Sequence, residues 1–535
     1  MPDPTNSSHS PLAPVPSDAE ADAPRIDGPP AMGTARTHPA DAALSDQAMP
    51  LRFWLGLIIF VGIALRVIVL ILGSAWQIDR AANPETPRDL ELASAIIAGK
   101  GLSHPHAIDA LAAPQLLTHD RLLLNLQLTG ARDTAPELNH MPGYPTLLAL
   151  LDLLHIPLQG LLFVQVALAG LLIGLTFAVT RQLLGSEKAG LLAAAAVAVH
   201  PWAIVSSTGL GTELIFALLV VAGLWAVTAV SARPFSAAGG GGLLMGLATL
   251  VRPLGLLVGP IAAACVLFRE PRKGRAVVLA GIILVISLAP AALWVVRNDL
   301  RSGERVLTHA GTIRAYFDTT ATLSHPASSG VSPAETLLNA QEPGESLYGT
   351  MARITRREAA ERPADYFHVA GQRAATRLSD HGVDRLYGQL GLTYRPTGLR
   401  NAVLHHAPPV APAHGWADAA THSLAAGWMS FNLLLAGLAL AGLAALALRR
   451  RWTALFTLVA LGLWLTFAWP LPTHDGRLAL IAVQAAAIGA LLLPAVQRVK
   501  KPRKKRKRKD RWMTDDEADD PAASSVLHKT SMRPV

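Results

Sequence analysis

The stretch Phe53-Trp-Leu-Gly-Leu-Ile-Ile-Phe-Val-Gly-Ile-Ala-Leu-Arg-Val-Ile-Val-Leu-Ile-Leu-Gly73 decides the fold class of this chain. A helix needs about 20 apolar residues to cross the hydrocarbon core of a bilayer, and this stretch supplies them with Arg66 as its only charged side chain. Similar apolar stretches recur as far as residue 496, separated by polar breaks. Because an apolar helix satisfies its own backbone hydrogen bonds in lipid, the sequence predicts an all-α polytopic membrane protein.

About ten spans are predicted. They lie at 53–73, 158–180, 189–208, 210–231, 239–253, 254–269, 276–296, 425–448, 453–470 and 478–496. The pair at 239–269 is the most irregular, because Arg252-Pro253 interrupts it and each half is shorter than a full crossing. If the two halves form one broken helix, the number of spans is odd and the second long loop moves to the other face of the membrane.

Composition agrees with the membrane class. Hydrophobic residues make up 51% of the chain and charged residues 16%, with a mean hydropathy of +0.34. The net charge of +9 is concentrated in the basic run at 500–509, directly after the last span. Placed there, the run predicts an anchor on anionic lipid rather than a nucleic-acid site. Cys265 is the only cysteine, so no disulfide forms within the chain.

Lysine and arginine gather in alternate loops, which predicts that both termini are cytoplasmic and that the polar loops 74–145 and 297–424 lie outside. The chain divides into a disordered cytoplasmic tail (1–51), an N-terminal membrane module (52–300) with a first outer catalytic loop (74–145), an outer-face soluble segment (301–424), C-terminal transmembrane helices (425–496) and a disordered basic cytoplasmic tail (497–535). The tails are expected to be disordered because they hold few large apolar side chains.

The sequence lacks the motifs of several classes of enzyme. The chain has no GxxxxGK[ST], no HExxH and no GxSxG elbow, which disfavours an ATPase, a zinc protease and a serine hydrolase. It also shows no internal repeat of the kind that builds two-half carriers.

The stretch Glu85-Thr-Pro-Arg-Asp-Leu-Glu-Leu-Ala-Ser-Ala-Ile-Ile-Ala-Gly-Lys-Gly-Leu-Ser103 resembles the first outer loop of the C-type (GT-C) membrane glycosyltransferases, where an acid precedes a short amphipathic helix that ends in Gly-x-Gly. Further strings follow in that family's order: Met141-Pro-Gly-Tyr-Pro145, His200-Pro-Trp202 before Thr212-Glu213, Leu250-Val-Arg-Pro253, Trp294-Val-Val-Arg-Asn298 and Asp475-Gly-Arg477. The set is similar to the polyprenyl-phosphate-sugar-dependent group, which includes protein mannosyltransferases, the aminoarabinose transferase of lipid A and rhizobial core glycosyltransferases.

The resemblance implies a GT-C-like bundle and a glycosyltransferase, either hexosyl- or pentosyl-, in a bacterial inner membrane. Its partners would be membrane lipid, a polyprenyl-phosphate sugar donor and a lipid, glycan or protein acceptor at the periplasmic face. Such transfer needs a carboxylate to accept the proton of the acceptor hydroxyl and cations to stabilise the leaving phosphate. No cofactor is predicted. A divalent metal stays open, because His104-Pro-His106 offers two imidazoles.

Three acids of the first outer loop are candidates for the catalytic base. Glu85 aligns with the family's base position, where most relatives have Asp. Asp89 lies one helical turn further on and either shares the site or replaces Glu85, and Asp79 lies closer to the first span. The alternative for each is a solvated acid in a loop.

The predicted substrate-binding side chains lie near span ends or motif strings: Arg66, Tyr144, Glu213, Arg252, Arg297 and Arg477. For the arginines, phosphate binding competes with a plain interfacial or snorkelling role. Tyr144 either shapes the entry to the next span or touches substrate, and Glu213 is expected to pair with one of these arginines to hold the shape of the site.

Two other functions stay open. A carrier or flippase for lipid-linked sugars would place these charges at mid-membrane on facing helices, whereas an enzyme would gather them at one outer site. A non-catalytic member of the family would tolerate Glu85 at the base position.

Overall fold

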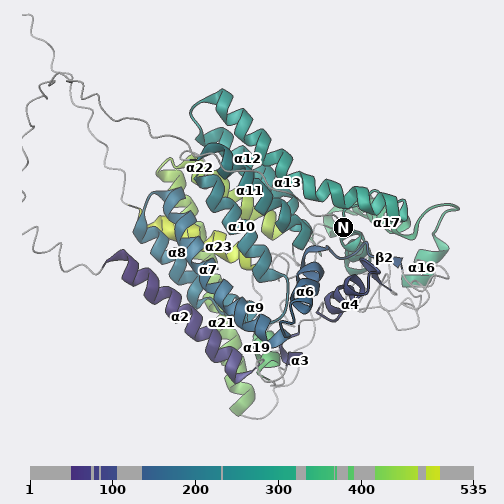
Figure 1. Ribbon diagram of the computed structural model, residues 1–535, viewed down its shortest axis with the longest axis horizontal. Helices are drawn as coiled ribbons and strands as arrows, with labels where there is room; N and C mark the ends of the chain where they lie inside the picture. The colour runs from purple at the N-terminus through teal and green to yellow at the C-terminus, as the bar shows by residue number, and fades with distance from the viewer. Residues whose placement is uncertain are drawn as a thin grey trace, which may run out of the picture. The chain divides into compact units, whose positions relative to one another are not determined.

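The structure is a computed structural model that describes residues 50–73, 78–82, 86–104, 135–229, 233–320, 333–366, 368–369, 371, 383–390, 416–467 and 477–493. The chain separates into two compact units, residues 1–53 and 54–535, and all elements below lie in the second apart from the start of α2 (Leu51–Leu72). Helices make up almost all of the described elements (Figure 1). The exception is a two-residue antiparallel ladder between β1 (Ser103–His104) and β2 (Ala135–Pro136). The predicted all-α class is confirmed.

Five helices in the described ranges are long and apolar enough to cross a membrane. They are α2, α7 (Leu158–Leu184), α11 (Pro234–Val251), α13 (Lys273–Ser302) and residues Ser430–Leu448 of α21 (Trp416–Leu448). A sixth arises if α8 (Glu187–Val199) and α9 (Pro201–Ser207), which meet at a bend of 62°, count as one span. The chain is therefore a multi-pass membrane protein.

The four remaining predicted spans coincide with shorter apolar helices. These are α10 (Glu213–Thr228), the 3-10 turn η1 (Pro253–Leu257) followed by α12 (Val258–Arg269), α22 (Trp452–Phe467), and α23 (Arg477–Gly489) with η3 (Ala490–Leu492). Length and composition mark none of them as a complete crossing, so the count of ten is not confirmed. The predicted interruption at Arg252-Pro253 is confirmed, because α11 ends at Val251 and η1 begins at Pro253, whose ring cannot continue an α-helix.

Small residues allow the membrane helices to pack closely. A Cβ atom at Gly223 of α10 would lie 3.2 Å from the Gly241 carbonyl oxygen of α11, and one at Gly246 of α11 would lie 3.0 Å from the Ser287 carbonyl oxygen of α13. Glycine at these positions brings the backbones together, as is typical of helix pairs in lipid. Helix α11 therefore packs against both α10 and α13.

Two short helices of the first outer loop pack on this module. They are α3 (Ile78–Ala81) and α4 (Thr86–Ile97), and α4 lies against α6 (Gly143–Leu153). A Cβ atom at Gly143 would lie 2.7 Å from the Leu250 carbonyl oxygen of α11. The glycine in Met141-Pro-Gly-Tyr-Pro145 therefore permits α6 to start directly against α11.

The segment 301–424, which was predicted to lie at the outer face, contains a small helical lobe. It comprises α14 (Ala310–Arg314), the π-turn η2 (Ala315–Thr320), α16 (Pro333–Asn339) and α17 (Leu347–Glu361), around a core that includes Tyr316, Phe317 and Met351. A separate helix, α19 (Val383–Gln389), belongs to the same stretch of chain. This lobe has its own apolar core outside the membrane spans, as the amphipathic pattern of α17 indicates.

Candidate functional site

Of the three candidate bases, the described structure buries Asp89. It lies in the first turn of α4, where a carboxylate is favoured by the helix dipole, and it is only 3% exposed. Asp79, on α3, is exposed to solvent. Glu85 lies outside the described residues. Asp89 therefore does not fit the alternative of a solvated loop acid, whereas Asp79 does.

The charge of the Asp89 carboxylate contributes to raising the pKa of both Tyr144 and His140. Tyr144, in the first turn of α6, is 1% exposed. The backbone N–H of Leu210 donates to the Ala81 carbonyl oxygen at 2.7 Å. This bond joins the first outer loop to the segment between α9 and α10, so the buried acid is fixed against the membrane module.

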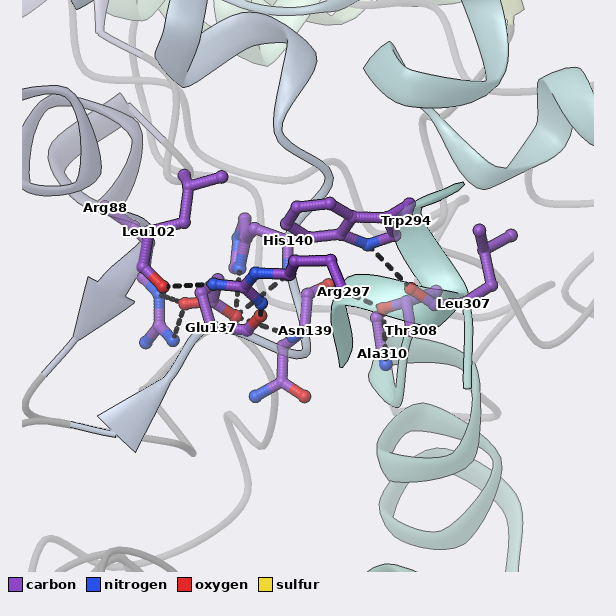
Figure 2. Close-up of polar contacts among 10 residues, drawn as sticks. All are labelled: Arg88, Leu102, Glu137, Asn139, His140, Trp294, Arg297, Leu307, Thr308 and Ala310. Carbon is purple, nitrogen blue, oxygen red and sulfur yellow. Dashed lines mark hydrogen bonds and ion pairs between the residues drawn. The ribbon is translucent and has the colours of Figure 1, made fainter. Parts of the chain in front are cut away.

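The most heavily bonded carboxylate near Asp89 is Glu137, which the sequence analysis did not single out (Figure 2). One of its oxygens accepts hydrogen bonds from Arg88 Nε at 3.1 Å and Arg88 Nη2 at 2.5 Å. The other accepts from the backbone N–H groups of Asn139 at 2.6 Å and His140 at 2.9 Å. The Glu137 side chain is fully buried and that of Arg88 is 5% exposed, so each needs the other's charge.

The groups around Glu137 favour its ionised form. Burial alone would raise the pKa of Glu137, but the charges and hydrogen bonds of Arg88 and His140 outweigh it and hold the pKa well below its usual range. Burial would lower the pKa of His140, but Glu137, 3.8 Å from its Nδ1 atom, raises that pKa to about 9. At neutral pH the strip from Glu137 to His140 therefore holds one anion and one imidazolium cation.

Arg297 binds this strip from α13. Its Nη1 atom donates to the Glu137 carbonyl oxygen at 3.0 Å and its Nη2 atom to the Leu102 carbonyl oxygen at 2.7 Å, while its guanidinium lies 4.6 Å from the Trp294 ring (Figure 2). Arg297, which was predicted to bind phosphate, thus holds two separate segments of the first outer loop, at Leu102 and Glu137, to α13.

A second group of charged side chains surrounds Trp202 at the start of α9. Glu213 accepts hydrogen bonds from Trp202 Nε1 at 3.1 Å and from Arg385 Nη1 at 3.1 Å. The guanidinium of Arg385 lies 4.7 Å from the centre of the Trp202 rings, and that of Arg477 lies 4.3 Å from it. Both are cation–π distances. The arginine that pairs with Glu213 is Arg385 of α19, which is not one of the four arginines predicted as its partner.

Two further buried arginines bind the same stretch of chain. Arg66 Nε donates to Ser207 Oγ at 2.9 Å, and its Nη1 atom donates to the Ala198 carbonyl oxygen at 3.0 Å. Arg252 Nε donates to Thr212 Oγ1 at 2.5 Å. Arg66 is therefore satisfied inside the helix bundle rather than by snorkelling to headgroups.

In the described part of the chain, four arginines from separate parts of the sequence contact residues 197–213: Arg66, Arg252, Arg385 and Arg477. That stretch contains Glu213 as its only carboxylate. An excess of guanidinium groups in a region largely removed from water favours an anion such as a phosphate. We call these four arginines with Trp202 the basic cluster.

Two residues of these groups, Glu137 and Arg385, were missed by the predictions from sequence. Glu137 lies four residues before Met141 of the Met141-Pro-Gly-Tyr-Pro145 string, where an acid could have been weighed as a partner for Arg88. Arg385 lies far along the outer segment, and no pattern relates it to Glu213. Among the described residues, no three His, Cys, Asp or Glu side chains gather closely enough to hold a metal ion, and His106 lies outside them.

Residues 139–294 match the family model described as dolichyl-phosphate-mannose-protein mannosyltransferase. This segment contains Tyr144, Trp202, Glu213 and Arg252, and the match confirms the GT-C resemblance over it. No curated protein matches the chain.

Among solved structures, similar folds include the oligosaccharyltransferase AglB from Archaeoglobus fulgidus in complex with an inhibitory peptide and a dolichol-phosphate (14% identity, TM-score 0.40) and the same organism's oligosaccharyltransferase in the apo form (14%, 0.41). Each match covers 82% of this chain and 50% of the other, so the chain spans about half the length of these structures. Because the TM-scores are below 0.5, functional conclusions rest on the residues of the site and on the family match.

Proposed function

We propose that this protein is a membrane glycosyltransferase that moves a sugar from a polyprenyl-phosphate carrier to a lipid, glycan or protein acceptor at the periplasmic face of a bacterial inner membrane. The observation that carries the proposal is that residues 210–213 contact both the first outer loop, in which Asp89 is buried, and two arginines of the basic cluster: the Leu210 N–H donates to the Ala81 carbonyl oxygen, Thr212 accepts from Arg252, and Glu213 accepts from Arg385. The family match supports the use of a lipid-phosphate sugar.

In the reaction, Asp89 is the base. Its carboxylate accepts the proton of the acceptor hydroxyl while that oxygen bonds to the anomeric carbon of the sugar. The bond from the anomeric carbon to the phosphate oxygen breaks, and its electron pair leaves with the polyprenyl phosphate. A buried carboxylate is suited to this step because water competes little for the transferred sugar.

The basic cluster holds the phosphate. Negative charge grows on the phosphate oxygens as the bond breaks, and guanidinium groups placed near them stabilise that charge without reorganising. Arg477 and Arg252 are the ligands we assign first. Arg66 is already engaged by backbone carbonyl oxygens, so it fixes the shape of the site.

Sugar transfer in membranes from a mixture of radiolabelled polyprenyl-phosphate hexoses and pentoses tests the assignment. We expect Asp89→Asn to lower transfer by about 100-fold or more, the scale of a lost general base, with the amount of folded protein unchanged. Glu91→Gln is the matched control, because Glu91 is an exposed acid on the same helix, and it should transfer normally.

Glu85→Gln and Asp79→Asn complete the series. If Asp89→Asn transfers normally and one of these does not, that residue is the base instead. If the wild-type chain transfers no label but moves the labelled lipid across the bilayer, the carrier function replaces the enzyme.

A further inference from the structure

Two buried side chains that the proposed reaction does not use have polar atoms without a hydrogen-bond partner among the described residues. They are Tyr144 of α6, through its hydroxyl, and Gln165 of α7, through both Oε1 and Nε2. Both side chains are at most 1% exposed, so bulk water does not reach them. Unpaired buried donors and acceptors cost free energy of folding, and most such groups in proteins are paired. A substrate that supplies the missing partners would account for them.

Both side chains face one apolar cluster. Tyr144 packs in this cluster with Leu161 and Leu162 of α7 and with Leu210. Gln165 follows Leu162 by three residues and Leu161 by four, and residues at these spacings share one face of a helix. The buried amide of Gln165 therefore lies on the face of α7 that packs around the Tyr144 ring.

The Tyr144 hydroxyl lies near three other groups. Burial raises the pKa of Tyr144 and the charge of Asp89 adds to the increase, whereas the backbone of Gly211 and the side chain of Gln165 act in the opposite direction. The last two groups are therefore close to the hydroxyl, although neither completes a hydrogen bond with it. The unpaired atoms thus lie near both the proposed base and residue 211.

Gly211 relates these atoms to the proposed phosphate site. The next residue, Thr212, accepts a hydrogen bond from Arg252 at 2.5 Å. In a polyprenyl-phosphate sugar the anomeric carbon is bonded directly to a phosphate oxygen, so a phosphate held by Arg252 brings the sugar to the same place. A sugar hydroxyl both donates and accepts hydrogen bonds, which matches a phenol hydroxyl and a carboxamide.

We infer that Tyr144 and Gln165 bind a hydroxyl group of the transferred sugar. The inference rests on the proposed function, in which Asp89 is the base and Arg252 is a phosphate ligand. Residues that serve a substrate at the expense of stability have a recognisable property: removing their polar atoms stabilises the empty protein and weakens its activity. Polar atoms that are paired by buried structural water behave in the opposite way, because their removal costs stability and leaves transfer unchanged.

The first experiment compares Tyr144→Phe and Gln165→Leu with the wild-type protein, because these changes remove the polar atoms and nearly keep the size of each side chain. We expect both variants to have a higher thermal unfolding midpoint than wild type in the absence of donor. With the radiolabelled mixture of polyprenyl-phosphate hexoses and pentoses at limiting concentration, both should transfer about fivefold to tenfold less sugar, as expected for one lost hydrogen bond.

Thr180→Val is the matched control. Thr180 is buried about four turns further along α7 than Gln165, and its hydroxyl also has no hydrogen-bond partner among the described residues. Its methyl group lies beside α23, where a Cβ atom at Gly489 would be 3.2 Å from it. Thr180→Val should raise the unfolding midpoint and leave transfer unchanged, which separates a gain in stability from a loss of substrate binding.

The second experiment identifies the ligand as the sugar. Analogues of the sugar that wild type transfers, each lacking one ring hydroxyl, are supplied on the same polyprenyl phosphate. We expect wild type to transfer one analogue about tenfold less than the parent sugar. Gln165→Leu should transfer that analogue and the parent at similar rates, because the partner of the missing hydroxyl is already gone.

Normal transfer by either Tyr144→Phe or Gln165→Leu, or an unfolding midpoint that falls in either variant, overturns the inference. Full discrimination between the parent sugar and every analogue by Gln165→Leu also overturns it. If Gln165→Leu does not fold, Gln165→Met replaces it with the same expected results. A wild-type chain that transfers no sugar defeats the proposed function itself, which is a separate outcome.

Discussion

Two buried carboxylates, Asp89 and Glu137, lie in the same part of the molecule with different surroundings. Glu137 accepts two backbone N–H groups and a guanidinium, which stabilise its charged form. Asp89 lies in the first turn of a helix, and its charge contributes to raising the pKa of Tyr144 and of His140. A side chain whose charge is stabilised by such donors suits a structural anion.

At the residue scale, the raised pKa of His140 makes a prediction about stability and pH. The pKa is about 9 in the folded protein against an ordinary value of 6.5, so the folded state binds the proton more tightly. The resulting stabilisation is fully present below pH 6.5 and is lost as the pH rises through about 9. Between pH 7 and pH 10 we expect the thermal unfolding midpoint of the purified protein in detergent to fall.

The control is His140→Asn, which keeps the backbone bond to Glu137 but has no group that titrates there. Its midpoint should fall less over the same pH range. If the unfolding midpoints of the wild-type protein and of His140→Asn fall equally with rising pH, His140 does not cause the fall.

At the scale of the element, two glycines of α21 provide a matched pair. A Cβ atom at Gly442 would overlap the Ala487 carbonyl oxygen of α23, whereas one at Gly437 would meet nothing within 4 Å. We expect Gly442→Ala to destabilise the protein by about 1–3 kcal/mol through overpacking. Gly437→Ala should be neutral or stabilising by up to about 1 kcal/mol, because alanine is the better helix former.

Thermal unfolding of both variants in the same detergent makes the comparison. Equal midpoints would mean that α21 and α23 do not pack through Gly442. A loss confined to Gly442→Ala would support the close approach of these helices, which positions Arg477 at the start of α23.

At the scale of the whole molecule, α13 tests the predicted topology. It has 30 residues, which at 1.5 Å per residue gives a length of about 45 Å, more than the roughly 30 Å hydrocarbon core. Arg272 precedes it and Arg305 follows it, and both are exposed. In a Cys265→Ser background, Arg305→Cys should react with an impermeant maleimide on intact spheroplasts, and Arg272→Cys only after permeabilisation.

The reverse pattern would place the outer-face segment in the cytoplasm and would remove the proposed site from the periplasmic side. Labelling of both cysteines in intact cells would mean that α13 does not cross the membrane. Cys265→Ser is a mild change, because the side chain contacts the hydroxyl of Thr457 at 2.9 Å, which a serine hydroxyl can also bind.

The sequence was sufficient for features that depend on local composition. The length and hydropathy of 53–73 indicate a span wherever the stretch lies in the fold, because the cost of burying backbone in lipid is met within one helix. The break before Pro253 follows from the chemistry of one residue. The strings shared with GT-C enzymes located Tyr144, Glu213 and Arg252, which the structure buries within one connected region.

The partners of these side chains were decided only by the tertiary structure. Glu137 lies 49 positions from Arg88, and Arg385 lies 172 positions from Glu213, and neither spacing has a period that a helix or strand would repeat. Burial separates Asp89 from Asp79, although both are acids in the same outer loop. Hydropathy predicts which segments enter the membrane, because entry depends on each segment's own transfer free energy, and five of the ten predicted spans coincide with helices long and apolar enough to cross. Folding decided which charges meet, because a buried charge is stable only beside a partner that packing of distant segments brings to it.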